Sequence, residues 1–387
     1  MNEQENIKVS IVIPCLNEER TIGETVKNAL EGIPIAKVNG EVIIIDSSKD
    51  KSPEIAAQLG ARVISVPKRG LGQAYIDAMP HIRGKYVVMG DADCTYDFKE
   101  TYKFAEKLDQ GYEYVMGTRM KGVIEKGAMP PLHRYFGTPL TTWILNFLLG
   151  SKFSDIHCGL RAMTLDALKK IDIQSTSWEY ASEMVVKASL LKLKCTEVPI
   201  HFYKDKEGRI PHLRSNWFMP WHAGWINLKV MFLYAPNQVI IKPGLLFLLL
   251  GFILILMQVN GPLSIGPVTL STSFMLLGLT LSVLGFSSVQ MGVLVKLFSD
   301  LNRFVESKAT KFIYKYFTYS RGMILGFSLF FFGLILCLAL FVKWYSHGFK
   351  LQTIPWYVIL GLLNVIFGIQ TILFTLVCQA FSLTNKR

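Results

Sequence analysis

Short apolar runs alternate with amphipathic segments through the first part of the chain. Four of these runs predict strands, at residues 9–14, 42–46, 61–66 and 86–89. Between the first two runs, Ile22, Val26 and Leu30 recur at the spacing of a helix that buries one face. Strands that alternate with helices favour an α/β fold, with a mostly parallel sheet and right-handed crossovers.

The pattern changes after residue 110. Residues 114–119 predict a strand that ends in an arginine, and residues 197–203 predict an edge strand. Between them, residues 143–149 are apolar on nearly all sides but too few to span a bilayer. This segment is either a core helix or a helix in the membrane interface, and we favour the interface. Residues 153–161 read as a polar loop.

Four long apolar stretches close the chain, near residues 239–259, 268–295, 323–342 and 356–381. Each is long enough to cross a bilayer, which takes about 20 residues. The segment 216–234 before them is rich in Trp, Phe and Met and predicts a second interfacial helix. We therefore expect a catalytic domain at 1–215, a juxtamembrane helix at 216–238 and a transmembrane domain at 239–387.

The basic residues of the connections predict the orientation of these spans. The connection 260–267 has no Lys or Arg, whereas the connection 296–321 carries six. By the positive-inside rule, both termini and the catalytic domain face the cytoplasm of an integral plasma-membrane protein. The N-terminus is polar, without a signal-peptide pattern, so roughly the first 240 residues are expected in the cytosol.

The amino-acid composition limits the kinds of molecule that the protein is expected to bind. Lys and Arg number 41 against 29 Asp and Glu, a net charge of +12, which suits nucleic acid, anionic lipid or phosphorylated substrates. The six cysteines are scattered without a Cys-x-x-Cys pair, so neither a zinc site nor a redox motif is indicated. Cys94 adjoins an acidic pair, where small buried filler is favoured over a reactive thiol.

Two carboxylates, Asp91 and Asp93, follow the strand 86–89. They stand at the carboxyl end of the strand, the edge of an open α/β sheet at which ligands bind. At this spacing both can reach one Mg²⁺ or Mn²⁺ ion, whose other positions are filled by water and phosphate. The alternative to a metal site is an acidic turn without a functional role. Gly70 and Gly72 open a helix and could let a phosphate approach its N-terminus.

Together these features resemble glycosyltransferase family 2 of the GT-A, Rossmann-like nucleotide-sugar fold. The resemblance is nearest to polyprenyl-phosphate glycosyltransferases of the dolichol-phosphate mannose synthase and undecaprenyl-phosphate glucosyltransferase type. The segments that carry it are 12–18, 44–50, 69–74, 90–98, 116–119, 132–135, 155–161 and 211–214.

The resemblance implies roles for particular residues. The donor-binding set is Pro14, Leu16, Glu18, Ile45, Asp46, Arg69 and Ala92, with Arg209 and Arg214 as candidates for the diphosphate. Asp91 and Asp93 would hold the metal, and Thr95 stands where mannose synthases have an assisting glutamine, so water is the alternative ligand. Arg119, Arg134 and Thr138 match positions that hold the lipid phosphate.

The implied reaction is an inverting transfer of a hexose to a polyprenyl (dolichyl or undecaprenyl) phosphate. The donor is a nucleotide sugar of the GDP-mannose or UDP-glucose type. Because the acceptor oxygen is already anionic, Asp155 is assigned to positioning a sugar hydroxyl or the metal shell, with proton abstraction as runner-up. Glu179 and Glu183 share a helix face and could assist the arginines or simply face solvent. Expected partners are the nucleotide sugar, the polyprenyl phosphate and the membrane. A second copy is a candidate partner, and nucleic acid is not expected.

Two other readings stay open. A processive polysaccharide synthase would carry Gln-x-x-Arg-Trp before its membrane region, and this chain has no Arg-Trp. A non-catalytic scaffold or flippase for lipid-linked sugars would have a degenerate site, against which Asp91, Asp93, Arg119 and Arg134 argue. Transfer activity of an Asp93→Ala variant discriminates between the enzyme and the scaffold.

Overall fold

The computed structural model divides the chain into two units, Met1–Tyr234 and Ala235–Arg387. It describes residues 7–206, 235–259, 261–265, 268–301, 317–348 and 355–384, with the single residues 225, 229 and 315. Arg209, Arg214 and nearly all of the predicted juxtamembrane helix lie outside these residues.

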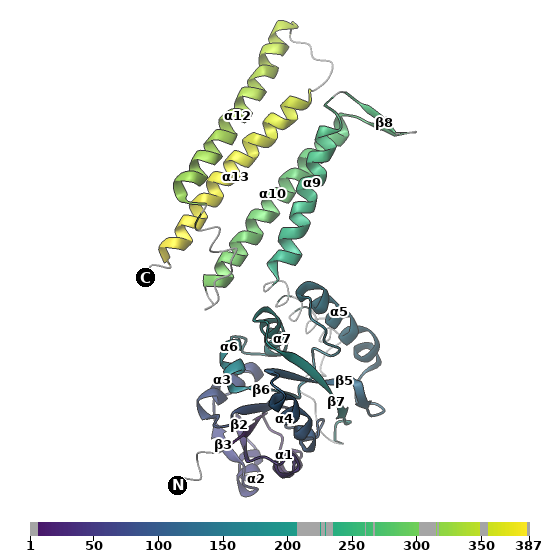
Figure 1. Ribbon diagram of the computed structural model, residues 1–387, viewed down its shortest axis with the longest axis vertical. Coiled ribbons are helices and arrows are strands. Elements are labelled where there is room, and N and C mark those ends of the chain that lie inside the picture. The colour runs from purple at the N-terminus through teal and green to yellow at the C-terminus, as the bar shows by residue number, and fades with distance from the viewer. Residues whose placement is uncertain are drawn as a thin grey trace. The chain divides into compact units, whose positions relative to one another are not determined.

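The first unit is built on one seven-stranded mixed sheet (Figure 1). Its strands are β1 (Val9–Cys15), β2 (Gly40–Asp46), β3 (Arg62–Ser65), β4 (Tyr86–Met89), β5 (Tyr114–Ile124), β6 (Arg161–Thr164) and β7 (Cys195–Phe202). They lie in the order β3-β2-β1-β4-β6-β5-β7. The sequence predicted the four N-terminal strands and their parallel pairing, and both are confirmed.

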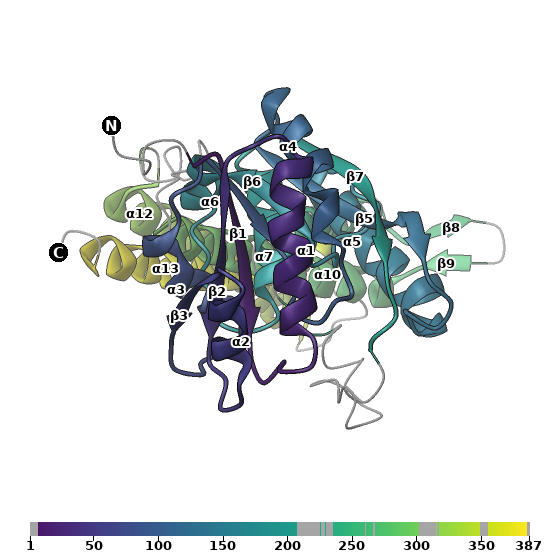
Figure 2. The same ribbon diagram turned by 90° about the horizontal axis from the view of Figure 1, so that it is seen from below.

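Helices cover both faces of this sheet. They are α1 (Ile22–Ile35), α2 (Ser52–Gln58), α3 (Leu71–Ala78), α4 (Thr101–Asp109), α5 (Thr138–Leu149), α6 (Leu165–Ile171) and α7 (Tyr180–Leu190). On one face α1 contacts α2 and α4, and on the other α7 contacts α3 and α6. Figure 2 looks onto the face that α1 covers. β1 and β4 are buried along their whole length, as their unbroken apolar runs predict.

The sheet departs from the predicted parallel pattern at β6. This strand runs antiparallel to both β4 and β5, and the sequence reading missed it within a polar loop. It is only four residues long and begins with Arg161, whose side chain is fully buried. β5 also continues past Arg119 to Ile124, where the sequence predicted its end. β7 is the edge strand that was predicted.

α5 is amphipathic rather than buried all round. Leu145 and Leu148 pack against the unit, while Trp143 and Phe147 are 63% and 72% exposed. The last two form a stacked aromatic pair on the surface. The helix therefore has one face in the core, as a core helix would, and one exposed apolar face, as a helix in the membrane interface would.

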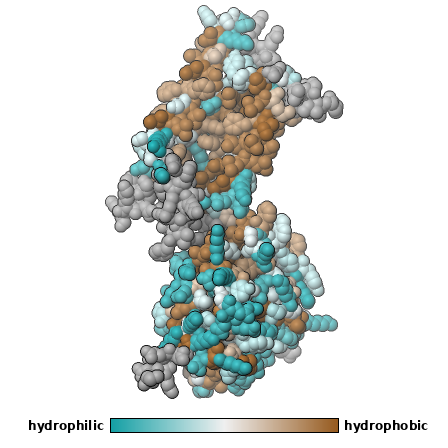
Figure 3. Space-filling view, in the orientation of Figure 1, coloured by the Kyte–Doolittle hydropathy of each residue, from teal (hydrophilic) through white to brown (hydrophobic). Residues whose placement is uncertain are grey.

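The second unit contains four helices that are long and apolar enough to cross a membrane. These are α9 (Lys242–Leu256), α10 (Thr272–Leu301), α12 (Tyr319–Ser346) and α13 (Trp356–Thr384). The four predicted spans are confirmed by length and composition. Many large apolar side chains on them are exposed, which gives this unit the brown surface in Figure 3.

Glycines bring these helices together in two similar pairs. A Cβ on Gly251 of α9 would lie 2.5 Å from the carbonyl oxygen of Gly278 of α10. Likewise, a Cβ on Gly333 of α12 would lie 2.6 Å from the carbonyl oxygen of Gly361 of α13. A second glycine contact recurs two turns away in both pairs, between Gly244 and Gly285 and between Gly326 and Gly368. Both hairpins are thus packed backbone to backbone, as small residues allow in membranes.

Candidate active site

A cleft of about 390 Å³ opens at the carboxyl ends of β1, β2 and β4. Its lining includes eight predicted site residues: Pro14, Leu16, Glu18, Ile45, Arg69, Asp91, Ala92 and Asp93. Parallel strands end at the same edge, so residues far apart in sequence meet there.

Asp46 ends β2 beside this cleft and is almost wholly buried. Its Oδ2 accepts a hydrogen bond from the backbone N–H of Ser48 at 3.1 Å. Its Oδ1 has no hydrogen-bond partner among the described residues. A buried carboxylate oxygen is costly to leave unpaired, so this atom suits a hydroxyl or N–H group of a ligand.

Asp91 and Asp93 both reach the cleft. Thr95 does not act as an independent ligand here, since its hydroxyl and backbone N–H both donate to Oδ1 of Asp93, at 2.5 and 3.0 Å. Asp91 lies against the loop before β6, and a Cβ on Gly159 would stand 2.6 Å from its Oδ2. Any side chain at position 159 would therefore displace the Asp91 carboxylate.

A divalent cation fits this pair by its chemistry. No cluster of three or more His, Cys, Asp or Glu residues that could hold a metal occurs in the described part of the chain. Mg²⁺ and Mn²⁺ do not need such a cluster, because one or two carboxylates suffice when water and substrate phosphate fill the other positions.

The glycines before α3 are required by a close contact within the protein, and the phosphate contact at Gly70 and Gly72 stays a prediction. Cβ atoms on Gly70 and Gly72 would collide with the carbonyl oxygens of Thr176 and Ser175. The backbone N–H of Gln73 donates to Thr176 at 3.0 Å. The close approach is therefore to the loop before α7. Arg69 lies at the cleft but is paired with Asp77 at 2.8 Å.

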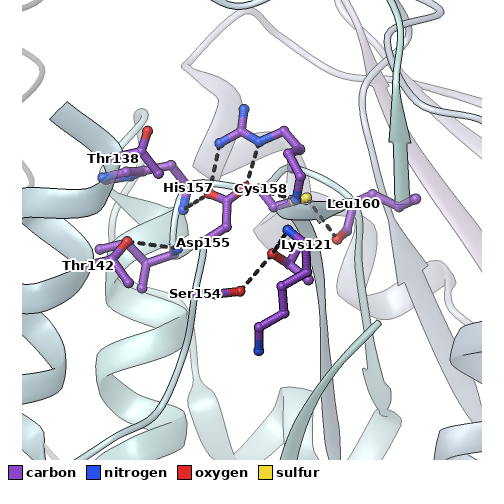
Figure 4. Close-up of polar contacts among 12 residues, drawn as sticks. Lys121, Thr138, Thr142, Ser154, Asp155, His157, Cys158 and Leu160 are labelled. Atoms are coloured by element: carbon purple, nitrogen blue, oxygen red, sulfur yellow. Dashed lines mark hydrogen bonds and ion pairs between the residues drawn. The ribbon is translucent and has the colours of Figure 1, made fainter. Parts of the chain in front are cut away.

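Arg119 and Asp155 form a buried ion pair. Figure 4 shows Asp155 beside Thr138 and Thr142 of α5. Nε and Nη2 of Arg119 donate to the two carboxylate oxygens of Asp155 at 2.7 and 2.9 Å. The Arg119 backbone N–H donates to Oδ2 at 3.1 Å and that of His157 to Oδ1 at 3.2 Å. Both oxygens of Asp155 are thus engaged within the protein, and its predicted contact with a sugar hydroxyl or the metal shell stays a prediction.

The pair is held in its charged form. Burial alone would raise the pKa of the Asp155 carboxyl, but Arg119 outweighs burial and holds that pKa below its usual range. Burial acts against the charge of Arg119 as well, and Asp155 raises the pKa of the guanidinium above its ordinary value. A carboxylate with a depressed pKa is a weak base, so this arrangement does not favour proton abstraction by Asp155.

The other two predicted acceptor residues belong to the segment that leads into α5. Thr138 begins the helix and is buried, and Arg134 lies over the ring of Tyr135 at 5.4 Å. His157, on the loop of Asp155, shares a 2.8 Å hydrogen bond with Thr141 of α5. Burial lowers the pKa of His157 to about 4, so the imidazole is neutral near pH 7.

Tyr96 lies between the cleft and the ion pair. Its hydroxyl accepts a hydrogen bond from the Gly159 backbone N–H at 2.8 Å, and its ring packs on Phe202. The guanidinium of Arg119 lies over that same Phe202 ring at 5.1 Å. Burial raises the pKa of Tyr96, Arg119 opposes the rise and Asp91 adds to it. The carboxylate pair and Arg119 therefore adjoin within one unit.

Glu183 does not face solvent, which was one of the two predicted alternatives. It is 0% exposed and pairs with Lys187 at 2.5 Å. It accepts hydrogen bonds from the backbone N–H groups of Gln174 and Ser175 at 3.1 and 2.7 Å. Glu179 lies just before α7, at its N-cap.

Three lining residues lie outside every segment that carries the resemblance and were missed from the sequence: Lys68, Ser177 and Trp178. Lys68 follows β3 and its charge gave a weak signal. Ser177 and Trp178 reach the cleft only because their loop packs on the start of α3, a contact that local patterns do not show. Cys94 is buried, and its thiol lies 3.3 Å from both the Thr21 carbonyl and the Thr25 hydroxyl, as expected of filler.

The first unit is a Rossmann-like mixed sheet with an acidic pair at its carboxyl edge, and four long apolar helices follow it in the chain. Comparison with known proteins shows which family models the chain matches. The model of glycosyl transferase family 2 matches residues 10–172, and that of the glycosyltransferase family 2 C-terminal transmembrane region matches residues 293–382.

Similar proteins cover most of the chain. The low-salt glycan biosynthesis hexosyltransferase Agl6 of Haloferax volcanii is 34% identical over 94% of this chain and 86% of its own length. A dolichyl-phosphate hexose transferase of that organism is 31% identical over 52% of this chain and 84% of its own. An undecaprenyl-phosphate 4-deoxy-4-formamido-L-arabinose transferase of Enterobacter sp. (strain 638) is 24% identical over 82% of this chain and 95% of its own. The chain belongs to glycosyl transferase family 2.

Proposed function

We propose that this enzyme transfers a hexose, with inversion, from a nucleotide sugar to a polyprenyl phosphate at the cytoplasmic face of a membrane. The observation that carries the proposal is the junction at Tyr96. There, a carboxylate pair suited to a metal-bound diphosphate adjoins Arg119, whose guanidinium suits a second phosphate. A donor and an acceptor that both carry phosphate need two such sites side by side.

The cleft is assigned to the donor. Pro14, Leu16 and Ile45 offer apolar walls for a base, and the unpaired Oδ1 of Asp46 offers an acceptor for the nucleoside. Asp91 and Asp93 would hold Mg²⁺ or Mn²⁺ against the diphosphate. When bound, the metal stabilises the negative charge that develops on the leaving nucleoside diphosphate.

The cluster at α5 is assigned to the acceptor phosphate. Arg119, Arg134 and Thr138 supply the charge and hydrogen bonds that grip and align a phosphate. A phosphate oxygen is already anionic at neutral pH, so no strong general base is required. Asp155 orients Arg119 and partly neutralises it, which leaves Asp155 as a positioning residue.

Three observations support a lipid acceptor. Relatives along most of the chain are named as transferases acting with dolichyl or undecaprenyl phosphate. Four helices of the second unit are apolar enough to span a membrane. α5, next to the proposed phosphate site, presents Trp143 and Phe147 on an exposed apolar face suited to a membrane surface.

Transfer of radiolabelled sugar tests the proposal. The full chain in detergent is incubated with Mn²⁺, a polyprenyl phosphate, and GDP-mannose, UDP-glucose or UDP-GlcNAc. We expect a lipid product carrying one sugar, and its loss in Asp93→Ala. A growing polymer would favour a polysaccharide synthase instead, and unchanged transfer by Asp93→Ala would contradict the assigned metal site.

A further inference from the structure

The loop before α7 forms one side of the cleft. Ser177 and Trp178 line it together with Asp91, Asp93 and the turn before α3. The indole of Trp178 is 45% exposed, although tryptophan is usually well covered in a folded domain. An exposed aromatic ring in a cleft that also holds acidic groups is a surface for a ligand.

This loop is fixed from beneath by a buried ion pair. Glu183 binds the N–H groups of Gln174 and Ser175, and the ammonium of Lys187 donates to the carbonyl oxygen of Asp172. Burial alone would raise the pKa of Glu183, but Lys187 and Ser175 lower it, so the carboxylate stays charged. None of these atoms reaches the cleft, so their effect on a ligand must pass through the loop.

The loop is also fixed from the side. Gly70 and Gly72 leave no room for a side chain against the carbonyls of Thr176 and Ser175. Just beyond Trp178, the ring of Tyr180 packs on Tyr75 with centroids 4.9 Å apart. The Tyr75 hydroxyl donates to the carbonyl oxygen of Gly90, next to Asp91, at 3.3 Å. Trp178 is therefore held at a set place relative to the acidic pair.

The position along the sheet distinguishes sugar from base. The unpaired oxygen of Asp46 lies at the end of β2. The Trp178 loop packs on the start of α3 and is linked through Tyr180 and Tyr75 to Gly90, which follows β4 on the opposite side of β1. If the nucleoside meets Asp46 and the diphosphate meets Asp91 and Asp93, the sugar is directed away from β2. The C–H face of a hexose stacks on the negative face of an aromatic ring.

Building on the proposed function, we propose that Trp178 is the platform on which the donor hexose stacks, and that Glu183 is the residue that positions it. Trp178 touches the substrate, whereas Glu183 acts only through the loop backbone. Selection among nucleotide sugars then depends on the fit of the hexose against this ring as well as on contacts to the base.

Binding of two matched probes tests the platform. Calorimetry on the full chain in detergent with Mn²⁺ compares UDP-glucose with UDP, and GDP-mannose with GDP. We expect Trp178→Ala to weaken binding of the accepted nucleotide sugar about tenfold, a stacking contact of ordinary strength, while binding of its nucleoside diphosphate is unchanged. Trp178→Phe should restore most of the loss. Tyr102→Ala, which removes an exposed aromatic side chain on α4, is the control.

Glu183→Gln tests the positioning role. It should raise KM for the nucleotide sugar with little change in KM for the polyprenyl phosphate or in nucleoside diphosphate binding. Because the variant leaves the buried Lys187 without its counter-charge, a lower thermal midpoint is expected and does not decide the matter. Equal weakening of the nucleotide sugar, the nucleoside diphosphate and the polyprenyl phosphate would overturn the role of Glu183.

The outcomes separate the two proposals. If the wild-type chain neither binds a nucleotide sugar nor transfers its sugar, both the proposed function and the role of Trp178 are wrong. If the wild type binds the sugar nucleotide and Trp178→Ala binds it equally well, the platform alone is wrong. If Trp178→Ala loses nucleoside diphosphate and nucleotide sugar to the same extent, Trp178 contacts the base and the hexose assignment is overturned.

Discussion

At the scale of single residues, the Arg119–Asp155 pair decides how the acceptor site is read. Asp155→Asn would leave the buried guanidinium without a counter-charge, and breaking such a pair costs about 3–5 kcal/mol. We expect a lower thermal midpoint and a raised KM for the polyprenyl phosphate, with a smaller change in KM for the donor. If kcat alone fell, and did so with a new pH dependence, Asp155 would be a base after all.

Gly159 supports Asp91 by its lack of a side chain. In Gly159→Ala the new Cβ would stand 2.6 Å from Oδ2 of Asp91, so the carboxylate must move. We expect transfer to need a several-fold higher Mn²⁺ concentration, measured by titrating the metal at saturating substrates. An unchanged metal requirement would show that Asp91 has room to shift or that it does not bind the metal.

His157 makes stability depend on pH. Its pKa falls from 6.5 to about 4 in the folded state, chiefly through burial. Between these values the unfolded chain binds the proton and the folded chain does not, so stability decreases as pH is lowered through this range. The thermal midpoint should fall from pH 6.5 to 4, and His157→Gln should show a shallower fall. An identical profile in the variant would assign the loss to other groups.

The sequence predicted the residues that line the cleft better than the others because most of them stand at the end of an apolar strand. Eight of the predicted residues line one cleft, since parallel strands end at a common edge. Asp155 could not be interpreted in this way, because its partner Arg119 lies on another element and pairs with it only after folding. Trp178 was missed for the same reason.

At the scale of elements, short strands with charged residues escaped prediction. β6 has four residues and starts with Arg161, which is enclosed by the Tyr114 hydroxyl and the carbonyl oxygens of Cys158 and Ala181. These hydrogen bonds make burial of the guanidinium tolerable, and the partners Tyr114 and Ala181 come from remote segments. The long spans were predicted well because their signal lies within each segment.

The α9–α10 hairpin depends on close helix contact. Gly251→Leu would force the side chain into the backbone of Gly278, and overpacking of this kind typically costs about 1–3 kcal/mol. We expect a lower thermal midpoint in detergent. Leu249→Ala, at a site 59% exposed on the same helix, should have a much smaller effect. Equal effects of the two variants would argue against the glycine contact.

At the scale of the whole molecule, the predicted orientation can be tested independently of catalysis. A cysteine at Ser264, in the hairpin between the first two spans, should react with a membrane-impermeant maleimide added outside intact cells. A cysteine at Glu106, on the exposed side of α4, should react only after the cells are opened. The reverse pattern would place the catalytic unit outside and contradict the use of a cytoplasmic nucleotide sugar.

The repeated glycine contacts have a consequence for how such a protein can change over time. The same arrangement of four glycines occurs in both hairpins of the chain. It consists of Gly244, Gly251, Gly278 and Gly285 in one and of Gly326, Gly333, Gly361 and Gly368 in the other. Exposed apolar residues on the outside of either hairpin can be substituted freely during evolution. A side chain at any of these glycines would instead collide with the backbone of the facing helix. The two hairpins can therefore drift apart in sequence yet keep one shape.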